Sequence, residues 1–284
     1  MKNRGADLKI KVNEFNVSYN DYGPDNAPVV FFIHGFPFDK SMWDKQVEAL
    51  QDHYRVISYD IRGHGKSDSG KEDFSIELFV SDLIGLMDAL SIEKAVLCGL
   101  SLGGYIALCA IETHPDRFEA LILSDTQCIA DTPEAKQKRM TAIKNIKEYG
   151  VEQYADESLK NLFAPSSVQT KSTEIAAVRK MITKTSKNTL CNTLQALSIR
   201  KETCSKLPDI VVPVLIMVGK EDKITPPTAA RLMHERIQGS TLCILEDASH
   251  LSNMENPQKF NFQLNKFMHQ FADRPFQLSY TNSY

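Results

Sequence analysis

One stretch of the chain combines a nucleophilic side chain with the glycines that would expose it. Residues 95–98 form a short apolar run, a Gly-x-Ser-x-Gly turn centred on Ser101 follows, and apolar residues at helical spacing begin at Tyr105. A strand, a sharp turn and a helix in this order would lift the Ser101 hydroxyl above the edge of a sheet. Glycines keep Cβ atoms out of the space where strand and helix nearly touch. The stretch therefore predicts an exposed serine nucleophile.

Ser101 needs two partner side chains before it can attack a carbonyl group. A serine hydroxyl is a weak nucleophile at neutral pH, so an imidazole must take its proton, and a carboxylate must orient that imidazole. His250 and Asp222 fit these roles because each comes just after an apolar run that we expect to be a strand. Asp125 also follows such a run and is the main alternative to Asp222. Other histidines compete with His250, namely His34, His53, His64, His114, His234 and His269.

The oxygen that becomes negative during such an attack needs hydrogen-bond donors. One would be the backbone N–H of Leu102, the residue after the nucleophile. The other would come from the loop that precedes Trp43, where Phe36 is the best candidate. Gly35, Phe38 and Trp43 belong to the same part of the chain and could line a substrate pocket, although packing in the core explains the two aromatic residues equally well.

The elements that would position these residues form an α/β fold. Apolar runs without alternation, typical of strands buried on both faces, are separated by stretches with helical periodicity. This alternation predicts a mostly parallel central sheet with helices on both faces, and its site lies where the strands end. We expect an antiparallel hairpin over residues 8–12 and 15–19, further strands at 29–33, 55–59, 95–98, 120–124, 214–218 and 241–245, and helices at 43–50, 75–90, 225–238 and 257–271.

Residues 126–206 interrupt this pattern. The strand-like runs stop there, and charged amphipathic stretches at 132–149, 151–163, 175–182 and 190–197 predict four helices. About eighty residues of helix between two strands are typical of a lid. We therefore expect a core over residues 1–125, a helical lid insertion over 126–206 and the rest of the core over 207–284. Its C-terminal tail, residues 273–284, is polar and aromatic without any period.

Composition excludes several classes of protein. The 284 residues are 42% hydrophobic and 24% charged, which is ordinary for a globular domain. A net charge of −3 gives no sign of the basic face that a nucleic acid requires. The longest apolar runs, at 29–33 and 214–218, are far too short to span a membrane. No apolar stretch follows the basic residues near the start, so we expect no signal peptide.

The cysteines lack any recognisable pairing motif. Three of them, Cys98, Cys109 and Cys243, lie within apolar patterns, as small core residues do. The simplest interpretation is a reducing, cytoplasmic compartment, with no zinc site because no set of cysteines and histidines has ligand spacing. The six cysteines are Cys98, Cys109, Cys128, Cys191, Cys204 and Cys243.

Taken together, these motifs resemble the α/β-hydrolase superfamily. The resemblance covers roughly residues 29–125 and 214–267, and in this superfamily the nucleophile, the acid and the histidine follow one another along the chain. It implies these roles, in this order, for Ser101, Asp222 and His250. The matching residues are His34-Gly35-Phe36-Pro37 with Trp43, Asp60-x-Arg62-Gly63-His64-Gly65-x-Ser67-Asp68, Gly99-x-Ser101-x-Gly103-Gly104, Asp222 and His250-Leu251.

Within the superfamily, the chain is similar to small esterases, enol-lactone hydrolases, carbon–carbon bond hydrolases and cofactor-free haloperoxidases. Haloalkane dehalogenases and epoxide hydrolases share the Arg-Gly-x-Gly-x-Ser loop but use an aspartate nucleophile, so Ser101 argues against both. The resemblance implies a serine hydrolase that cleaves a small carboxylic ester or lactone through an acyl-enzyme on Ser101, without a metal or an organic cofactor.

Two alternatives stay open. The same three side chains could act on a carbon–carbon bond or form a peracid, although peroxidase-like members tend to have Met where Leu102 stands. A protein of this fold could also bind a small signalling ligand and hydrolyse it slowly or not at all.

Overall fold

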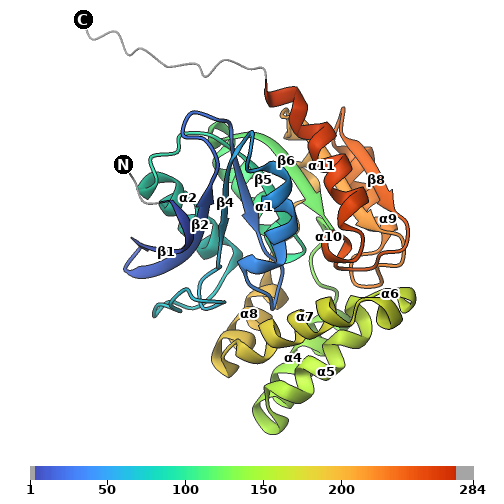
Figure 1. Ribbon diagram of the computed structural model, residues 1–284. Coiled ribbons are helices and arrows are strands. Elements are labelled where there is room, and N and C mark those ends of the chain that lie inside the picture. The colour runs from blue at the N-terminus through green and yellow to red at the C-terminus, as the bar shows by residue number, and fades with distance from the viewer. Residues whose placement is uncertain (1–3, 273–284) are drawn as a thin grey trace, which may run out of the picture.

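An eight-stranded sheet forms the centre of the computed structural model, which describes residues 4–272 (Figure 1). Its order is β1-β2-β4-β3-β5-β6-β7-β8, and all neighbours from β4 to β8 run parallel. The hairpin of β1 and β2 joins the sheet antiparallel to β4. The strands are β1 (Gly5–Val12), β2 (Phe15–Tyr22), β3 (Val29–Ile33), β4 (Arg55–Tyr59), β5 (Ala95–Leu100), β6 (Phe118–Ser124), β7 (Val214–Gly219) and β8 (Thr241–Leu245).

Both faces of this sheet are covered by helices. Side chains alternate along β3, so Phe31 and Ile33 pack toward α2, α3 and α9, whereas Val30 and Phe32 pack toward α1 and α11. The predicted α/β architecture, with a mostly parallel sheet, is confirmed. The elements outside residues 126–206 are the 3-10 helices η1 (Lys40–Trp43) and η2 (Pro115–Arg117) and the helices α1 (Asp44–Leu50), α2 (Ile76–Ala89), α3 (Leu102–Thr113), α9 (Pro227–Arg236), α10 (Ser252–Glu255) and α11 (Pro257–Ala272).

Five helices lie between β6 and β7, within residues 126–206, which we call the lid segment (Figure 1). Thr132 and Ser186 begin two of them as N-caps, each accepting a hydrogen bond from the N–H three residues later. Four of the five helices were expected, and the six-residue α6 was not, because it is too short to show a helical period. They are α4 (Pro133–Tyr149), α5 (Val151–Leu162), α6 (Pro165–Thr170), α7 (Ser172–Lys184) and α8 (Lys187–Ile199), followed by the 3-10 helix η3 (Cys204–Asp209).

Two expectations concern membranes and the chain end. Among the helices of residues 4–272, none is long and apolar enough to cross a bilayer. The C-terminal tail, residues 273–284, lies outside the described residues.

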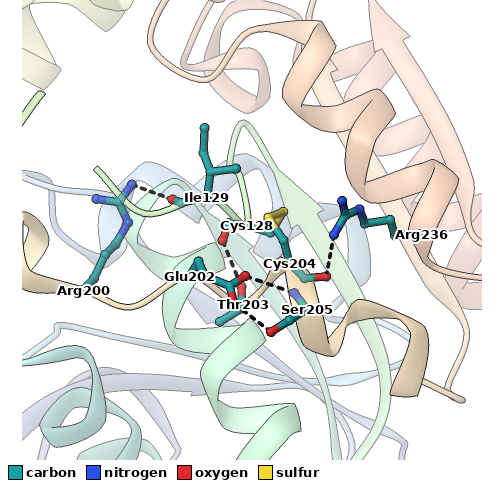
Figure 2. The surroundings of a disulfide bond; sticks show 8 residues. All are labelled: Cys128, Ile129, Arg200, Glu202, Thr203, Cys204, Ser205 and Arg236. Atoms are coloured by element: carbon teal, nitrogen blue, oxygen red, sulfur yellow. Dashed lines mark hydrogen bonds between the residues drawn. A yellow bond between two sulfur atoms is a disulfide. The ribbon is translucent and has the colours of Figure 1, made fainter. Parts of the chain in front are cut away.

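A disulfide between Cys128 and Cys204 joins the two ends of the lid segment (Figure 2). The same neck is closed by hydrogen bonds from the Thr203 N–H to the Cys128 carbonyl (2.8 Å) and from Arg200 to the Ile129 carbonyl (3.0 Å). The expectation that the cysteines are reduced is therefore wrong for this pair. No spacing motif marks it, because the fold brings together two residues that are 76 positions apart.

We predict that the unreduced protein, unfolded in guanidinium, exposes four thiols to a thiol reagent, because Cys98, Cys109, Cys191 and Cys243 are free. Reduction should lower the free energy of unfolding by about 4 kcal/mol, since it releases a long loop in the unfolded chain. The measurement is a denaturation curve with and without reductant, with Cys109→Ala as the control. Six reactive thiols before reduction would contradict the pairing.

Candidate active site

The turn at Ser101 is shaped by close backbone contacts. Ser101 lies between β5 and α3 with φ 52° and ψ −110°, a region that non-glycine residues rarely adopt. A Cβ on Gly99 would lie 2.3 Å from the Gly103 carbonyl oxygen, and one on Gly103 would lie 2.1 Å from that of Ile33. Only glycine fits at either position. The Thr126 hydroxyl holds the turn by donating to the Ser101 carbonyl at 2.8 Å.

Three side chains from separate loops form a continuous hydrogen-bonded chain. His250, in the loop after β8, lies with Nε2 3.0 Å from Ser101 Oγ and Nδ1 2.8 Å from Asp222 Oδ2. Asp222, in the loop after β7, also accepts hydrogen bonds from the N–H groups of Ile224 and Thr225 and from the Thr225 hydroxyl. All three are buried, and Ser101 keeps 9% of its surface exposed.

The charges of this chain are set by burial and by mutual contact. Burial alone would lower the pKa of His250, but the Asp222 carboxylate outweighs it and holds that pKa above the ordinary 6.5. Burial alone would raise the pKa of Asp222, yet His250 and the hydrogen bonds from Thr225 keep it below its ordinary value. Asp222 is therefore ionised at neutral pH, and His250 is a stronger base than a free imidazole.

Asp125, the alternative acid, lies nearby but plays a different part. It accepts a hydrogen bond from the Gly219 N–H at 2.8 Å and bonds the Ser252 hydroxyl. Burial and the charge of Asp222 raise its pKa well above the ordinary value. Asp125 braces the loops that carry the other residues, and Asp222 is the carboxylate that contacts His250.

Two backbone N–H groups near Ser101 were expected to act as donors. Leu102 is the first residue of α3, and Phe36 lies in the loop after β3. In the part of the chain that the structure describes, neither N–H donates a hydrogen bond to another residue. His34 braces the second loop, because its Nδ1 bonds the Gly35 carbonyl and its Nε2 accepts from the Ile61 N–H. Burial lowers the pKa of His34 to about 4, which keeps it neutral.

The structure does not bring the two candidate pocket aromatics to the site. Phe38 and Trp43 have no accessible surface. Trp43 stacks on Phe32 with ring centroids 4.8 Å apart and lies 6.1 Å from Phe260 of α11, so both residues belong to the core on that face of the sheet. Gly35 is buried, with space for a Cβ blocked by the Leu100 side chain at 2.9 Å.

An apolar cluster from the lid segment covers the Phe36 loop instead. The ring of Phe36 lies 6.5 Å from that of Tyr154 on α5, and both pack against buried residues of α4 and α8. The sequence indicated amphipathic helices here, but their periodicity could not tell which residues meet Phe36. The buried members are Ile146, Leu190, Cys191 and Leu194. Across residues 4–272, no group of His, Cys, Asp or Glu is arranged to hold a metal ion.

Comparison with known proteins gives consistent matches. A family model described as the alpha/beta hydrolase fold matches residues 28–167. The chain is 30% identical over 262 residues to 3-oxoadipate enol-lactonase 2 of Acinetobacter baylyi, covering 92% of this chain and 96% of that protein. A thermophilic esterase from Thermogutta terrifontis superposes with a TM-score of 0.88 at 31% identity, covering 93% of this chain and 98% of that one. The enol-lactonase from Burkholderia xenovorans superposes with a TM-score of 0.87 at 31% identity, covering 92% of this chain and 100% of that one.

The geometry predicts how Ser101 reacts with a fluorophosphonate probe. Labelling should speed up as the pH rises through a midpoint above 6.5, because His250 must be neutral to take the proton and its pKa is raised. Asp222→Asn should slow labelling by about a thousandfold or more and lower the midpoint. Asp247→Asn is the matched control, since that carboxylate is exposed on the same loop as His250 and its removal should leave the midpoint in place. Equal effects of both substitutions would contradict the assignment.

Proposed function

The chain belongs to the α/β-hydrolase family, and on this premise we propose that it is a serine hydrolase that cleaves a small carboxylic ester or lactone. The observation that carries the proposal is the chain of contacts from Ser101 to His250 to Asp222, with distances of 3.0 and 2.8 Å. Two of the proteins that it resembles, each along nearly the whole length, are enol-lactonases.

In the first half of the reaction, Ser101 Oγ attacks the carbonyl carbon while His250 Nε2 takes its proton. Asp222 stabilises the imidazolium that forms. The N–H groups of Phe36 and Leu102, which donate to no other residue within 4–272, donate to the negative oxygen of the tetrahedral intermediate. When the intermediate collapses, His250 gives the proton to the leaving alcohol and the acyl group stays on Ser101.

In the second half, a water molecule takes the position of the alcohol. His250 removes its proton as it attacks the acyl-enzyme, and the same two N–H groups hold the second tetrahedral intermediate. Return of the proton to Ser101 Oγ releases the acid. With a lactone substrate the leaving alcohol belongs to the acyl group itself, so both products are one hydroxy acid, or its keto form if the alcohol is an enol.

The lid segment supports a small substrate with an apolar part. It acts as an insertion between two portions of the core and places Tyr154 and its apolar neighbours over Phe36. An ester carbonyl held at Phe36 and Leu102 would then have apolar side chains beside its acyl or alcohol group, where burial favours binding. We propose that residues 126–206 supply these apolar contacts to the substrate. Gly35 belongs to the loop that carries Phe36 and shapes it.

We predict that Ser101→Ala keeps the fold but loses about a thousandfold or more of the kcat for p-nitrophenyl acetate and for a five-membered lactone, because the acyl group has no acceptor. Intact-mass spectrometry of the wild-type protein during turnover should show an acyl adduct on Ser101. Ser166→Ala, at an exposed serine of the lid segment, is the control and should change neither result.

The same assays decide between this proposal and the alternatives. Esters and lactones of graded acyl length are compared with a β-diketone, which reports carbon–carbon cleavage, and with acetate plus peroxide, which reports peracid formation. Turnover that survives in Ser101→Ala would overturn the proposal. So would turnover near zero across the panel together with tight binding of one compound, which the ligand-binding alternative requires.

A further inference from the structure

Glu255 is a buried carboxylate that bonds two distant parts of the chain. It lies in α10 and is 3% exposed. One carboxylate oxygen accepts a hydrogen bond from the N–H of Ser249, the neighbour of His250, at 2.7 Å. The other accepts from the N–H of Ala164, between α5 and α6 of the lid segment, also at 2.7 Å. A single side chain therefore touches both the histidine loop and the lid segment.

The two contacts depend on each other. Ala164 is fully buried, so its N–H has no water to replace the carboxylate. A buried donor without an acceptor is destabilising, and a buried anion is stable only where hydrogen bonds compensate for lost hydration. The Ser167 hydroxyl in α6 adds a third contact to the carboxylate. Moving either the α5–α6 turn or the histidine loop away from Glu255 would therefore leave a buried charge short of donors.

Glu255 also acts on the charge of His250. Three carboxyl groups act on this imidazole, Asp222 by direct contact from the loop after β7, and Asp125 at the end of β6 and Glu255 on α10 through their charge. The negative charge of each group raises the pKa of His250, and Asp222 contributes most, followed by Asp125 and Glu255. Glu255 also bonds the lid segment through the Ala164 N–H.

We propose that Glu255 is a positioning residue for the hydrolytic reaction, which ties the α5–α6 turn of the lid segment to the loop of the catalytic histidine. The role in turnover rests on the proposed function of Ser101 and His250. The physical coupling between lid, Glu255 and His250 does not, and it is measured without substrate.

The first test compares two substitutions that each remove one negative charge. Glu255→Gln keeps one acceptor oxygen but turns an NH₂ group toward the other N–H donor. Glu246→Gln is the matched control, because Glu246 is half exposed and pairs with the exposed Lys220. By NMR titration of the imidazole, the pKa of His250 should fall by roughly half a unit in the Glu255 variant and stay unchanged in the control. Amide hydrogen exchange across residues 163–168 should accelerate only in the Glu255 variant.

Kinetics then separate positioning from general damage. We expect kcat for p-nitrophenyl acetate to fall about tenfold in Glu255→Gln, with the acid limb of kcat/KM moving to lower pH. A merely structural role would lower activity at every pH and leave the limb in place. If Ser101→Ala also fails to abolish turnover, the proposed function is wrong, while the titration and exchange results still stand on their own.

A measurement on the wild-type protein covers the case in which Glu255→Gln does not fold. Burial raises the pKa of Glu255 above its ordinary 4.5, so the Ser249 and Ala164 amide signals should titrate together with one midpoint above that value. Amide hydrogen exchange in the lid segment should accelerate as the pH falls through the same midpoint. Separate midpoints, or a variant that folds with the His250 pKa and lid exchange of the wild type, would overturn the inference.

Discussion

The constraint on which the site depends is the close contact between the start of α3 and the end of β3. β3 and β5 are parallel neighbours with Ile33 opposite Gly99, and Gly103 lies against the Ile33 carbonyl with no space for a Cβ. This contact forces the turn between β5 and α3 into its strained form and places Ser101 at its tip. It also sets the loop after β3 beside that turn. Ser101 and the backbone of Phe36 and Leu102 are therefore positioned by one strand register, before any side chain of the site is considered.

Burial then distinguishes carboxyl groups that are chemically alike. Asp222 accepts three local hydrogen bonds and contacts His250, so it stays ionised in spite of burial. Asp125 has one backbone N–H and the Ser252 hydroxyl as donors, and burial together with the charge of Asp222 raises its pKa well above the ordinary value. Opposite pKa shifts in neighbouring groups are typical of sites where proton transfer matters. Here the pKa of Asp222 is kept low by hydrogen-bond donors from the loop after β7, in addition to the contact with His250.

The sequence predicted the sheet, most helices and the three side chains that share hydrogen bonds, because each depends on a local pattern. The run of residues 29–33 shows burial on both faces, and Gly-x-Ser-x-Gly shows the turn directly. Trp43 could not be placed in this way, because closeness to Phe36 along the chain does not say which face of the sheet a side chain meets. The 3-10 turn over Lys40–Trp43 directs it beneath the sheet, onto Phe32.

The sequence did not predict contacts between residues that are far apart in the chain, because no spacing motif marks them. These contacts determine how the lid segment is held. The disulfide fixes its two ends at the neck, and Glu255 fixes the α5–α6 turn with charge-assisted hydrogen bonds. Between these points the contact with the Phe36 loop is apolar, and within residues 4–272 no hydrogen bond joins residues 34–38 to the lid segment. Apolar contacts are non-directional, so Tyr154 and its neighbours can repack against Phe36 at little cost, provided a similar area stays buried. The lid segment is therefore bonded at its neck and at the α5–α6 turn, whereas apolar contacts hold it over the Phe36 loop.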